Sequence, residues 1–363
     1  MQILRLLIVF ATFFTVTNAK PQSKKYKVHT IAFYNIENFY DTINDPNTRD
    51  DEWVYSKKYY LQKVSNIAKI ISQLGTADNP NAPAIIGLTE VENRMTLETL
   101  VKDPQITALD YGIIHYDSPD RRGIDCAFLY QKKHFKPTSS KNIPLYIYES
   151  DTNISKKNVD DGDTATDDKV EVDQVSKRIY TRDQILLTGL IDNEEMHFIV
   201  NHWPSRRGGE AISRPLREKA AALNIKIIDS LQKINKNAKI ITMGDLNDGP
   251  FNDSLKKVLK AKGKKSEVPP LGLYNPMEGM ANKGFGTLAY RDAWDIFDQM
   301  IMTEPFIQSD YSQYRFWKAG IYNKSFMIQP DGRYKGYGLR NNDLVPGFSD
   351  HFPVYVYLIK EVK

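Results

Sequence analysis

The chain carries the sequence Ser349-Asp350-His351-Phe352-Pro353-Val354 just before and into its last apolar segment, residues 353–358. That segment has the pattern of a buried strand, because it is short, apolar and rich in Val and Tyr. A carboxylate and an imidazole therefore stand directly before a predicted strand, where a rigid scaffold can present them to a substrate. Polar side chains stand at the ends of other predicted strands of the chain as well.

Seven further segments have the pattern of strands, and polar clusters stand at the ends of several of them. The predicted strands are 28–34, 84–88, 126–130, 185–191, 196–200, 240–243 and 299–302. The polar clusters are Asn35-Ile36-Glu37-Asn38, Glu90-Val91-Glu92-Asn93, His202, Asp245-Leu246-Asn247 and Asp298. With the final cluster, six strand ends carry carboxylates, amides and two histidines, which indicates one assembled site.

Two segments have the three- and four-residue apolar spacing of helices that cover a sheet. The first is 57–74, and the second follows Pro215 and extends to Ile234, with the proline expected in the first helical turn. Strands outnumber helices, and short turns join many of them. This pattern favours an α+β fold with a mixed or antiparallel sheet over a parallel doubly wound one.

The composition is that of a folded chain and excludes several classes. The 363 residues are 41% hydrophobic and 26% charged, which excludes a disordered or fibrous protein. The net charge of +4 is too small to indicate a nucleic-acid binder by itself. The single cysteine, Cys126, excludes an internal disulfide and a thiolate zinc site, and its apolar surroundings predict a buried, unreactive thiol.

The N-terminal residues have the pattern of a secretory signal peptide. Arg5 precedes the apolar run 6–16, and Thr17-Asn18-Ala19 follows it. The run is too short to span about 30 Å of hydrocarbon, so we expect no stable membrane insertion. We expect cleavage near Ala19, a secreted or periplasmic protein, and a monomer of one domain over residues 20–363.

Residues 148–176 interrupt the apolar pattern with an acidic stretch that includes 160–168. We interpret this stretch as a surface insertion in the single domain. A calcium loop is the alternative, although the spacing does not match an EF-hand.

The residue types at the strand ends indicate metal-assisted hydrolysis. Two carboxylates with nearby amide oxygens suit Mg²⁺, with Mn²⁺ or Ca²⁺ as alternatives, because hard cations prefer oxygen ligands. The remaining Asp and His groups can move a proton and stabilise developing negative charge.

The strand-end strings together resemble the ordered motifs of the endonuclease/exonuclease/phosphatase superfamily. The matching strings are Ile31-Ala32-Phe33-Tyr34-Asn35, Leu88-Thr89-Glu90-Val91-Glu92, Asn201-His202-Trp203, Gly244-Asp245-Leu246-Asn247, Asp298-Gln299-Met300-Ile301 and Ser349-Asp350-His351-Phe352-Pro353-Val354. The resemblance spans nearly all of residues 20–363. It implies a four-layer α/β/β/α sandwich with two packed, mainly antiparallel sheets.

The resemblance also implies roles for individual residues. Glu90 is expected to bind the metal, with Asn35 and Asp350 near the ion or its waters. Asp245 is expected to orient or deprotonate the attacking water. Asn247 is expected to donate hydrogen bonds to the phosphate, and His351, paired with Asp298, to stabilise the phosphoryl oxygens or protonate the leaving oxygen.

A second histidine and a basic loop complete the expected site. His202 occupies a catalytic histidine position of deoxyribonuclease-like members, and Asp125 is expected to be its carboxylate partner. Arg206 and Arg207 follow in the next loop, and we expect them to bind phosphate because guanidinium groups pair with phosphate oxygens. A solvated basic loop is the alternative.

The leading interpretation is an exported Mg²⁺-dependent phosphodiester hydrolase that acts as a DNA or RNA endonuclease, with nucleic acid as its partner. One alternative is a phospholipid or sugar-phosphate phosphoesterase of the same fold. The other is a catalytically inactive binding module on this scaffold.

Overall fold

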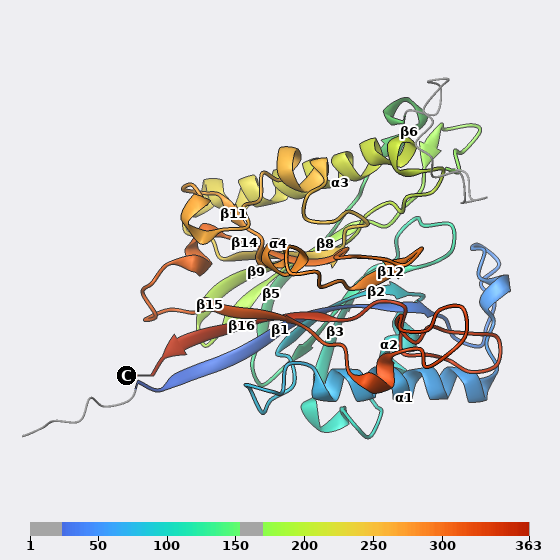
Figure 1. The fold of residues 1–363 in the computed structure, drawn as a ribbon, viewed down its shortest axis with the longest axis horizontal. Coiled ribbons are helices and arrows are strands. Elements are labelled where there is room, and N and C mark those ends of the chain that lie inside the picture. The colour runs from blue at the N-terminus through green and yellow to red at the C-terminus, as the bar shows by residue number, and fades with distance from the viewer. Residues whose placement is uncertain (1–23, 153–169, 363) are drawn as a thin grey trace, which may run out of the picture.

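Two six-stranded sheets pack face to face in the computed structural model, which describes residues 24–152 and 170–362. Helix α3 (Glu210–Ile234) covers the outer face of one sheet, and helix α1 (Lys57–Gln73) covers the outer face of the other (Figure 1). The arrangement is the four-layer α/β/β/α sandwich that the resemblance implied, with mainly antiparallel strands.

The first sheet has the strand order β15-β16-β1-β2-β4-β3. Its strands are β1 (Tyr26–Phe39), β2 (Ile85–Val91), β3 (Tyr111–His115), β4 (Asp125–Gln131), β15 (Arg315–Ile321) and β16 (Val354–Glu361). Only β1 and β2 run parallel to each other in this sheet.

The second sheet has the strand order β11-β14-β10-β9-β8-β5. Its strands are β5 (Lys136–Ile143), β8 (Gln184–Ile191), β9 (Glu194–His202), β10 (Ile240–Asp245), β11 (Leu273–Tyr274) and β14 (Asp298–Thr303). Here β9 and β10 are the parallel pair. Two small ladders join β6 (Ile147–Tyr148) to β7 (Arg178–Ile179) and β12 (Leu288–Tyr290) to β13 (Ala293–Asp295).

Three apolar layers follow from the alternation of side chains along the strands. Phe33 of β1 points into the layer between the sheets, where it joins Phe198 and Met243 of the second sheet. Its neighbours Ala32 and Tyr34 point the other way, into the layer beneath α1. The third layer lies between the second sheet and α3.

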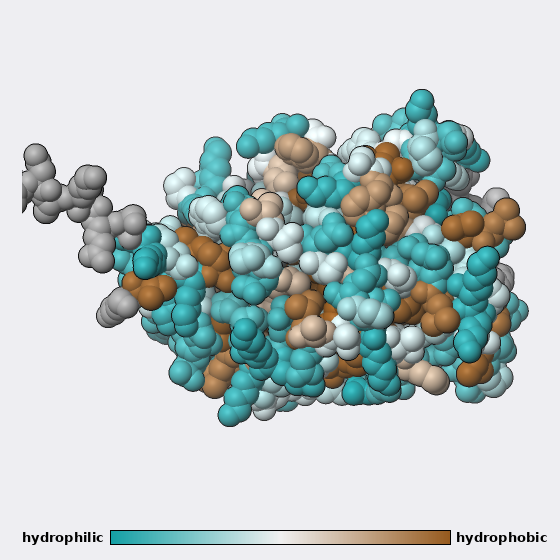
Figure 2. Space-filling view, turned by 90° about the horizontal axis from the view of Figure 1, so that it is seen from below, coloured by the Kyte–Doolittle hydropathy of each residue, from teal (hydrophilic) through white to brown (hydrophobic). Residues whose placement is uncertain are grey.

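The helices agree with the sequence in position and differ in detail. Helix α1 matches the predicted segment, and its side of the molecule is mainly hydrophilic (Figure 2). Helix α3 starts at Glu210, so Pro215 lies inside it and the prediction of a first-turn proline is wrong. Ser213 N–H already bonds the carbonyl of Gly209 one turn earlier, which starts the helix before the proline. The short helices α2 (Arg94–Leu100) and α4 (Pro276–Ala281) lacked an amphipathic pattern long enough to predict.

All eight predicted strands are present, and the missed strands are mostly short or at sheet edges. Strand β5 is an edge strand with mostly polar, partly exposed residues and a proline, Pro137, so it lacked the apolar signal. Strands β3 and β15 are edges as well.

The described ends of the acidic stretch lie next to each other. Its described ends are joined by the β6–β7 ladder, while residues 153–169 and the predicted signal peptide lie outside the described residues. Within the described ranges, no helix is long and apolar enough to cross a bilayer.

Candidate active site

Residues of five strands, β1, β2, β9, β10 and β14, meet where the two sheets face each other. In the second sheet, Asp245 at the end of β10 pairs in register with His202 at the end of β9 and with Asp298 at the start of β14. In the first sheet, Asn35 pairs with Thr89, directly before Glu90. Because parallel neighbours end at the same edge, the predicted polar clusters come together.

His351 is held as a cation between two carboxylates. Its Nδ1 lies 2.7 Å from Asp298 Oδ2, and its Nε2 lies 3.7 Å from Asp245 Oδ2. Burial favours the neutral ring, but the attraction of Asp298 and Asp245 outweighs it and raises the pKa of His351 well above its usual value. The ring can therefore donate from Nε2 at neutral pH.

His202 has the opposite protonation state. Its Nε2 lies 3.5 Å from Asp245 Oδ2 and 3.9 Å from Glu90 Oε1. Burial, reinforced by the positive charges of Arg182 and Arg122, holds the pKa of His202 well below its usual value. The buried Nδ1 has no hydrogen-bond partner among the described residues. A neutral imidazole thus faces the carboxylates.

Asp245 is the centre of the site. Its Oδ2 accepts a hydrogen bond from Asn35 Nδ2 at 3.1 Å, and its Oδ1 accepts the Asn247 N–H at 3.0 Å. Burial raises the pKa of Asp245 to about 6, although the His351 cation opposes the shift. A carboxylate with a pKa near neutrality is suited to accept a proton from water.

Glu90 is placed by a β-bulge. The pairing of β2 with β4 shifts between Thr89 and Val91, and Glu90 is the extra residue, with a left-handed φ of 65°. Its Oε2 accepts the Asn38 N–H at 2.8 Å, and its Oε1 lies 3.4 Å from Asn35 Nδ2. The bulge turns this carboxylate toward the strand ends.

Asn35 is oriented as a donor. Its Oδ1 accepts the Glu37 N–H at 3.0 Å, so its amide nitrogen faces Glu90 and Asp245. The expectation that Asn35 lies near the ion or its waters stays a prediction, because an amide oxygen has two lone pairs and the Glu37 N–H occupies only one of them.

Asp350 supplies a partly exposed carboxylate. Its Oδ2 lies 3.7 Å from a guanidinium nitrogen of Arg340, and its side chain is 26% exposed. With Glu90 it provides two carboxylates of the kind that a hard divalent cation prefers. Such a cation fits this donor set, because Asp245, Asp298 and Glu90 place several negative groups in one buried region.

Asn247 and Arg206 are tied together. Asn247 has a left-handed φ of 49°, and its Nδ2 donates to the Trp203 carbonyl at 3.0 Å. Arg206 Nε donates to the Asn247 carbonyl at 3.0 Å, and its guanidinium lies over the Phe297 ring. Arg206 therefore holds the loop after β10 in place. The sequence had predicted a phosphate contact for this residue.

The expected pairing of Asp125 with His202 is wrong. Asp125 Oδ2 lies 3.0 Å from His115 Nε2, and its Oδ1 accepts the Ser118 N–H at 2.7 Å. Strands β3 and β4 are neighbours, so His115 is the imidazole that the register brings to Asp125. With Asp117 these groups form a separate cluster, whose ligand atoms lie within 4.8 Å of one another.

Two buried charged groups beneath the site were not predicted as site residues. Burial raises the pKa of Glu37 to about 7 and lowers the pKa of Lys63 to about 8. Asn341 joins them, since its N–H donates to Glu37 Oε2 and its Oδ1 accepts from Lys63 Nζ, both at 2.9 Å. The sequence contained a signal for Lys63, which interrupts the apolar face of α1.

Arg182 is a further buried charge that sequence patterns did not identify. It donates to Asp120 Oδ2 at 2.9 Å and to the Trp203 carbonyl at 2.7 Å. Its place in the polar run Thr181-Arg182-Asp183, directly before β8, was the available signal.

Comparisons with known proteins agree on one fold. A profile of the Endonuclease/Exonuclease/phosphatase family matches residues 30–168 and 163–360. Truncated Caenorhabditis elegans TDP2 is 16% identical with a TM-score of 0.54, covering 91% of this chain and 97% of that one. D. rerio TDP2, solved with a single-strand DNA product, is 10% identical with a TM-score of 0.51, covering 91% and 98%.

A bacterial phosphatase has the fold as well. The mannosyl-6-phosphatase of Bacteroides thetaiotaomicron is 15% identical with a TM-score of 0.50, and the match covers 91% of this chain and 99% of that one. No curated protein sequence matches the chain.

Proposed function

The chain belongs to the endonuclease/exonuclease/phosphatase family of metal-dependent phosphoesterases, and on this premise we propose that it is an exported, Mg²⁺-dependent phosphodiesterase that cleaves nucleic acid. The hydrolase class follows from the family. The nucleic-acid substrate, the use of Mg²⁺ and the export of the chain are what we propose.

The observation that carries the proposal is the position of Asp245 between a neutral histidine, His202, and a cationic histidine, His351. Asp245 accepts a proton from the attacking water, since it faces both histidines at the strand ends and burial raises its pKa to about 6. His351 is the cation, and its Nε2 donates toward the phosphoryl or leaving oxygen. Groups with separated pKa values in one site are typical of acid–base pairs.

Glu90 and Asp350 would hold the divalent cation, and carboxylates with water ligands suit Mg²⁺. When bound, the cation supplies positive charge that polarises the phosphoester. Asn35 then keeps Glu90 and Asp245 in place, because its amide nitrogen lies within 3.1 Å of Asp245 and 3.4 Å of Glu90.

A nucleic-acid substrate is supported by the basic residues on the His202 side of the site. Arg122, Arg182 and Arg207 line one pocket there. D. rerio TDP2, which shares the fold, was solved with a single-strand DNA product. Guanidinium groups match phosphate oxygens in shape and charge.

A substrate panel tests the proposal. The purified chain 20–363 is assayed on plasmid DNA, RNA, sphingomyelin and a generic phosphodiester, with Mg²⁺ and after chelation. Mg²⁺-dependent cleavage of DNA or RNA is the expected result. Cleavage of sphingomyelin alone would contradict the nucleic-acid assignment and leave the hydrolase class intact.

A sugar-phosphate phosphoesterase is the second candidate. The mannosyl-6-phosphatase of B. thetaiotaomicron shares the fold. Trp294 is 41% exposed and stacks on Phe352, next to His351, with ring centroids 5.7 Å apart. An exposed indole face is suited to a sugar ring as well as to a base. Faster hydrolysis of a hexose monophosphate than of any diester would favour this candidate.

Export is proposed from residues 1–19 of the sequence alone. Expression of the full chain in a bacterium, followed by mass spectrometry of the periplasmic fraction, should find a protein that begins at Lys20. A full-length protein confined to the cytoplasm would contradict export.

A further inference from the structure

The side chain of Arg340, beside the proposed metal carboxylate Asp350, makes no hydrogen bond within the described ranges. Its Nη2 lies 3.7 Å from Asp350 Oδ2, which is too long for a hydrogen bond. Its Nε is buried and has no hydrogen-bond partner among residues 24–152 and 170–362. Buried donors are normally satisfied, because an unpaired one costs about 1–3 kcal/mol. The Arg340 guanidinium therefore has donors available for a ligand.

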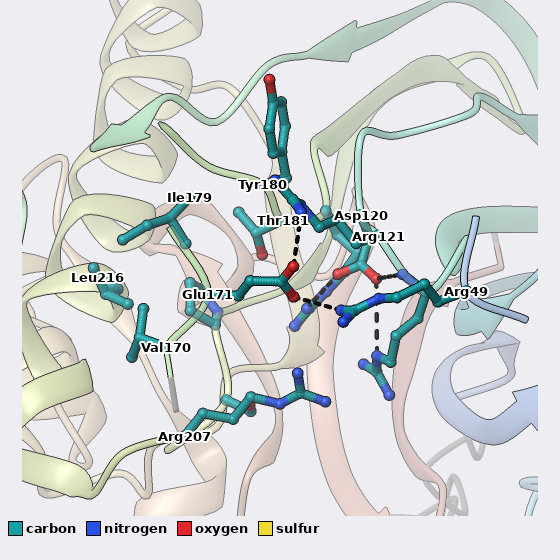
Figure 3. A pocket seen from close by; sticks show the side chains of 14 residues that line it. Arg49, Asp120, Arg121, Val170, Glu171, Ile179, Tyr180, Thr181, Arg207 and Leu216 are labelled. Atoms are coloured by element: carbon teal, nitrogen blue, oxygen red, sulfur yellow. Dashed lines mark hydrogen bonds and ion pairs between the residues drawn. The ribbon is translucent and has the colours of Figure 1, made fainter. Parts of the chain in front are cut away.

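Arg121, on the other side of the site, shows the contrast. Figure 3 shows Arg121 next to Glu171, and Arg121 Nη1 donates to Glu171 Oε1 at 2.7 Å. Its Nη2 donates to Asp173 Oδ2 at 3.1 Å. Both terminal nitrogens of Arg121 are thus bonded to carboxylates of the chain. Arg340 has a single, long ion pair with Asp350, and its side chain is 30% exposed, so a substrate can reach it.

The backbone on both sides of Arg340 is tied to other parts of the fold. The next residue, Asn341, donates from its N–H to Glu37 Oε2 and from Nδ2 to the Glu37 carbonyl, both at 2.9 Å. The preceding Leu339 N–H donates to the Met327 carbonyl at 2.7 Å. The backbone position of Arg340 is therefore fixed, although its guanidinium is not hydrogen-bonded.

A row of ring contacts leads from Arg340 to the residue that follows the catalytic histidine. The Arg340 guanidinium lies over the Tyr334 ring, 4.3 Å from its centroid. The contacts continue from Tyr334 to Tyr337 at 5.8 Å, from there to Trp294 at 6.2 Å, and finally to Phe352 at 5.7 Å. A ring beneath a guanidinium holds its plane in place and leaves the N–H edge available.

Arg340 thus stands where the proposed reaction places a phosphate. Its neighbour Asp350 is one of the two carboxylates that we propose for the cation, and Asp350 directly precedes His351. A phosphodiester has two non-bridging oxygens, and a guanidinium matches phosphate oxygens in shape and charge. A phosphate between the cation and His351 would present one of these oxygens on the Arg340 side.

We propose that Arg340 binds a non-bridging oxygen of the reacting phosphate, beside the cation held by Glu90 and Asp350. The inference rests on the proposed function and adds a substrate-binding residue to it. Arg340 stabilises the negative charge of the phosphate with N–H groups that no other part of the described chain uses. The alternative role, orienting Asp350 for the metal, is an outcome of the test.

Binding of inorganic phosphate tests Arg340 without turnover. Titration calorimetry is done on chain 20–363 with saturating Mg²⁺. Arg340→Ala should weaken phosphate binding at least about tenfold, since a charge-assisted contact is lost. Arg340→Lys should lose less, because lysine keeps the charge without the planar fork. Arg333→Ala, which removes an exposed arginine over the same Tyr334 ring, is the matched control and should change the Kd less than about twofold.

Mg²⁺ titration separates phosphate binding from the orientation of Asp350. Without phosphate, Arg340→Ala should bind Mg²⁺ at least as tightly as the wild type, because a positive charge next to Asp350 is removed. Mg²⁺ affinity that falls at least about tenfold in Arg340→Ala would overturn the inference and assign Arg340 to Asp350. Equal phosphate affinity in Arg340→Ala and the wild type, or no phosphate binding by the wild type, would also overturn it. The melting temperature of each variant excludes unfolding as the cause.

Sulfur substitution locates the contact on the substrate. The best phosphodiester of the substrate panel is prepared as its two phosphorothioate diastereomers, each with one non-bridging oxygen replaced. In the wild type, the diastereomer with sulfur facing Arg340 should react at least about tenfold more slowly than the oxygen substrate. Arg340→Ala should lose most of that difference, because the contact is already absent. Sulfur effects that are the same in both proteins for both diastereomers would overturn the inference.

The two proposals fail differently. Turnover of a phosphodiester with unchanged phosphate binding in Arg340→Ala overturns the role of Arg340 and leaves the phosphodiesterase intact. No turnover of any phosphoester overturns the proposed function, whereas the phosphate and Mg²⁺ titrations still decide whether Arg340 binds phosphate.

Discussion

Asp298 Oδ2 lies 2.7 Å from Nδ1 of His351, and both side chains are buried. This hydrogen bond fixes the ring so that Nε2 faces Asp245, and in the cation Nδ1–H donates to the Asp298 carboxylate. The other oxygen of Asp298, Oδ1, has no hydrogen-bond partner in the described part of the chain. Asp298 therefore acts on the reaction through His351, as a positioning residue.

Asp298→Asn should lower kcat by at least about 100-fold with little change in KM, because the His351 cation loses the charge that stabilises it. His351→Ala should lose at least as much. Steady-state kinetics and melting temperature are measured together, with Asp331→Asn, an exposed carboxyl, as the control. An increase in KM at unchanged kcat would contradict the role.

The pH dependence should show an acidic limb that belongs to Asp245. The pKa of Asp245 is raised from 3.8 to about 6, so the carboxylate that accepts the proton is lost as pH falls through that value. We expect kcat/KM to fall about tenfold per pH unit on this limb. A bound divalent cation favours the ionised form and moves the limb to lower pH. The residual rate of Asp245→Asn should lack the limb, and a wild-type rate that rises from pH 7 to pH 5 would contradict the assignment.

Glu90 should couple Mg²⁺ binding to stability. A ligand that binds only the folded chain stabilises it by about 2.7 kcal/mol at a concentration of 100 times its Kd. Mg²⁺ should therefore raise the melting temperature of the wild type, and Glu90→Gln should abolish most of that rise. Glu98→Gln, on the exposed face of α2, is the control. An equal rise in Glu90→Gln would place the metal elsewhere.

Arg206 and Arg207 should behave differently although they are adjacent. Arg206→Ala removes the hydrogen bond to the Asn247 carbonyl, so kcat should fall about tenfold at similar KM. Arg207→Ala should raise KM for polyanionic substrates. The kinetics of each variant on one DNA substrate decide the point, with Arg214→Ala on α3 as the control. Identical effects of both substitutions would contradict the distinction.

The α+β class and the strand ends could be predicted from the sequence because both depend on local patterns, whereas the four-layer sandwich was implied by the resemblance to the endonuclease/exonuclease/phosphatase superfamily. An apolar run followed by Asp245 and Asn247, or by His202, shows where a strand stops and which chemistry it presents. In the folded chain, the register of the parallel neighbours β9 and β10 brings those ends together.

Contacts between side chains were harder to predict, because they depend on register and on local backbone geometry. A one-residue shift moves a side chain to the other face of a sheet, and the β-bulge at Glu90 is such a shift. The partner of Asp125 is His115 because β3 lies beside β4, a pairing that no local pattern indicated. One pocket is lined by both Arg49 and Arg207, which are far apart in the sequence, so only the folded chain brings them together.

The most direct test of the account is the cleavage rate of a labelled single-stranded DNA oligonucleotide by chain 20–363, measured with Mg²⁺, after chelation, and in Asp245→Asn. We predict Mg²⁺-dependent cleavage that falls at least about 100-fold on chelation and in the variant, because both the cation and the proton acceptor are required. Cleavage by the wild type that persists after chelation, or full activity in a folded Asp245→Asn variant, would contradict it.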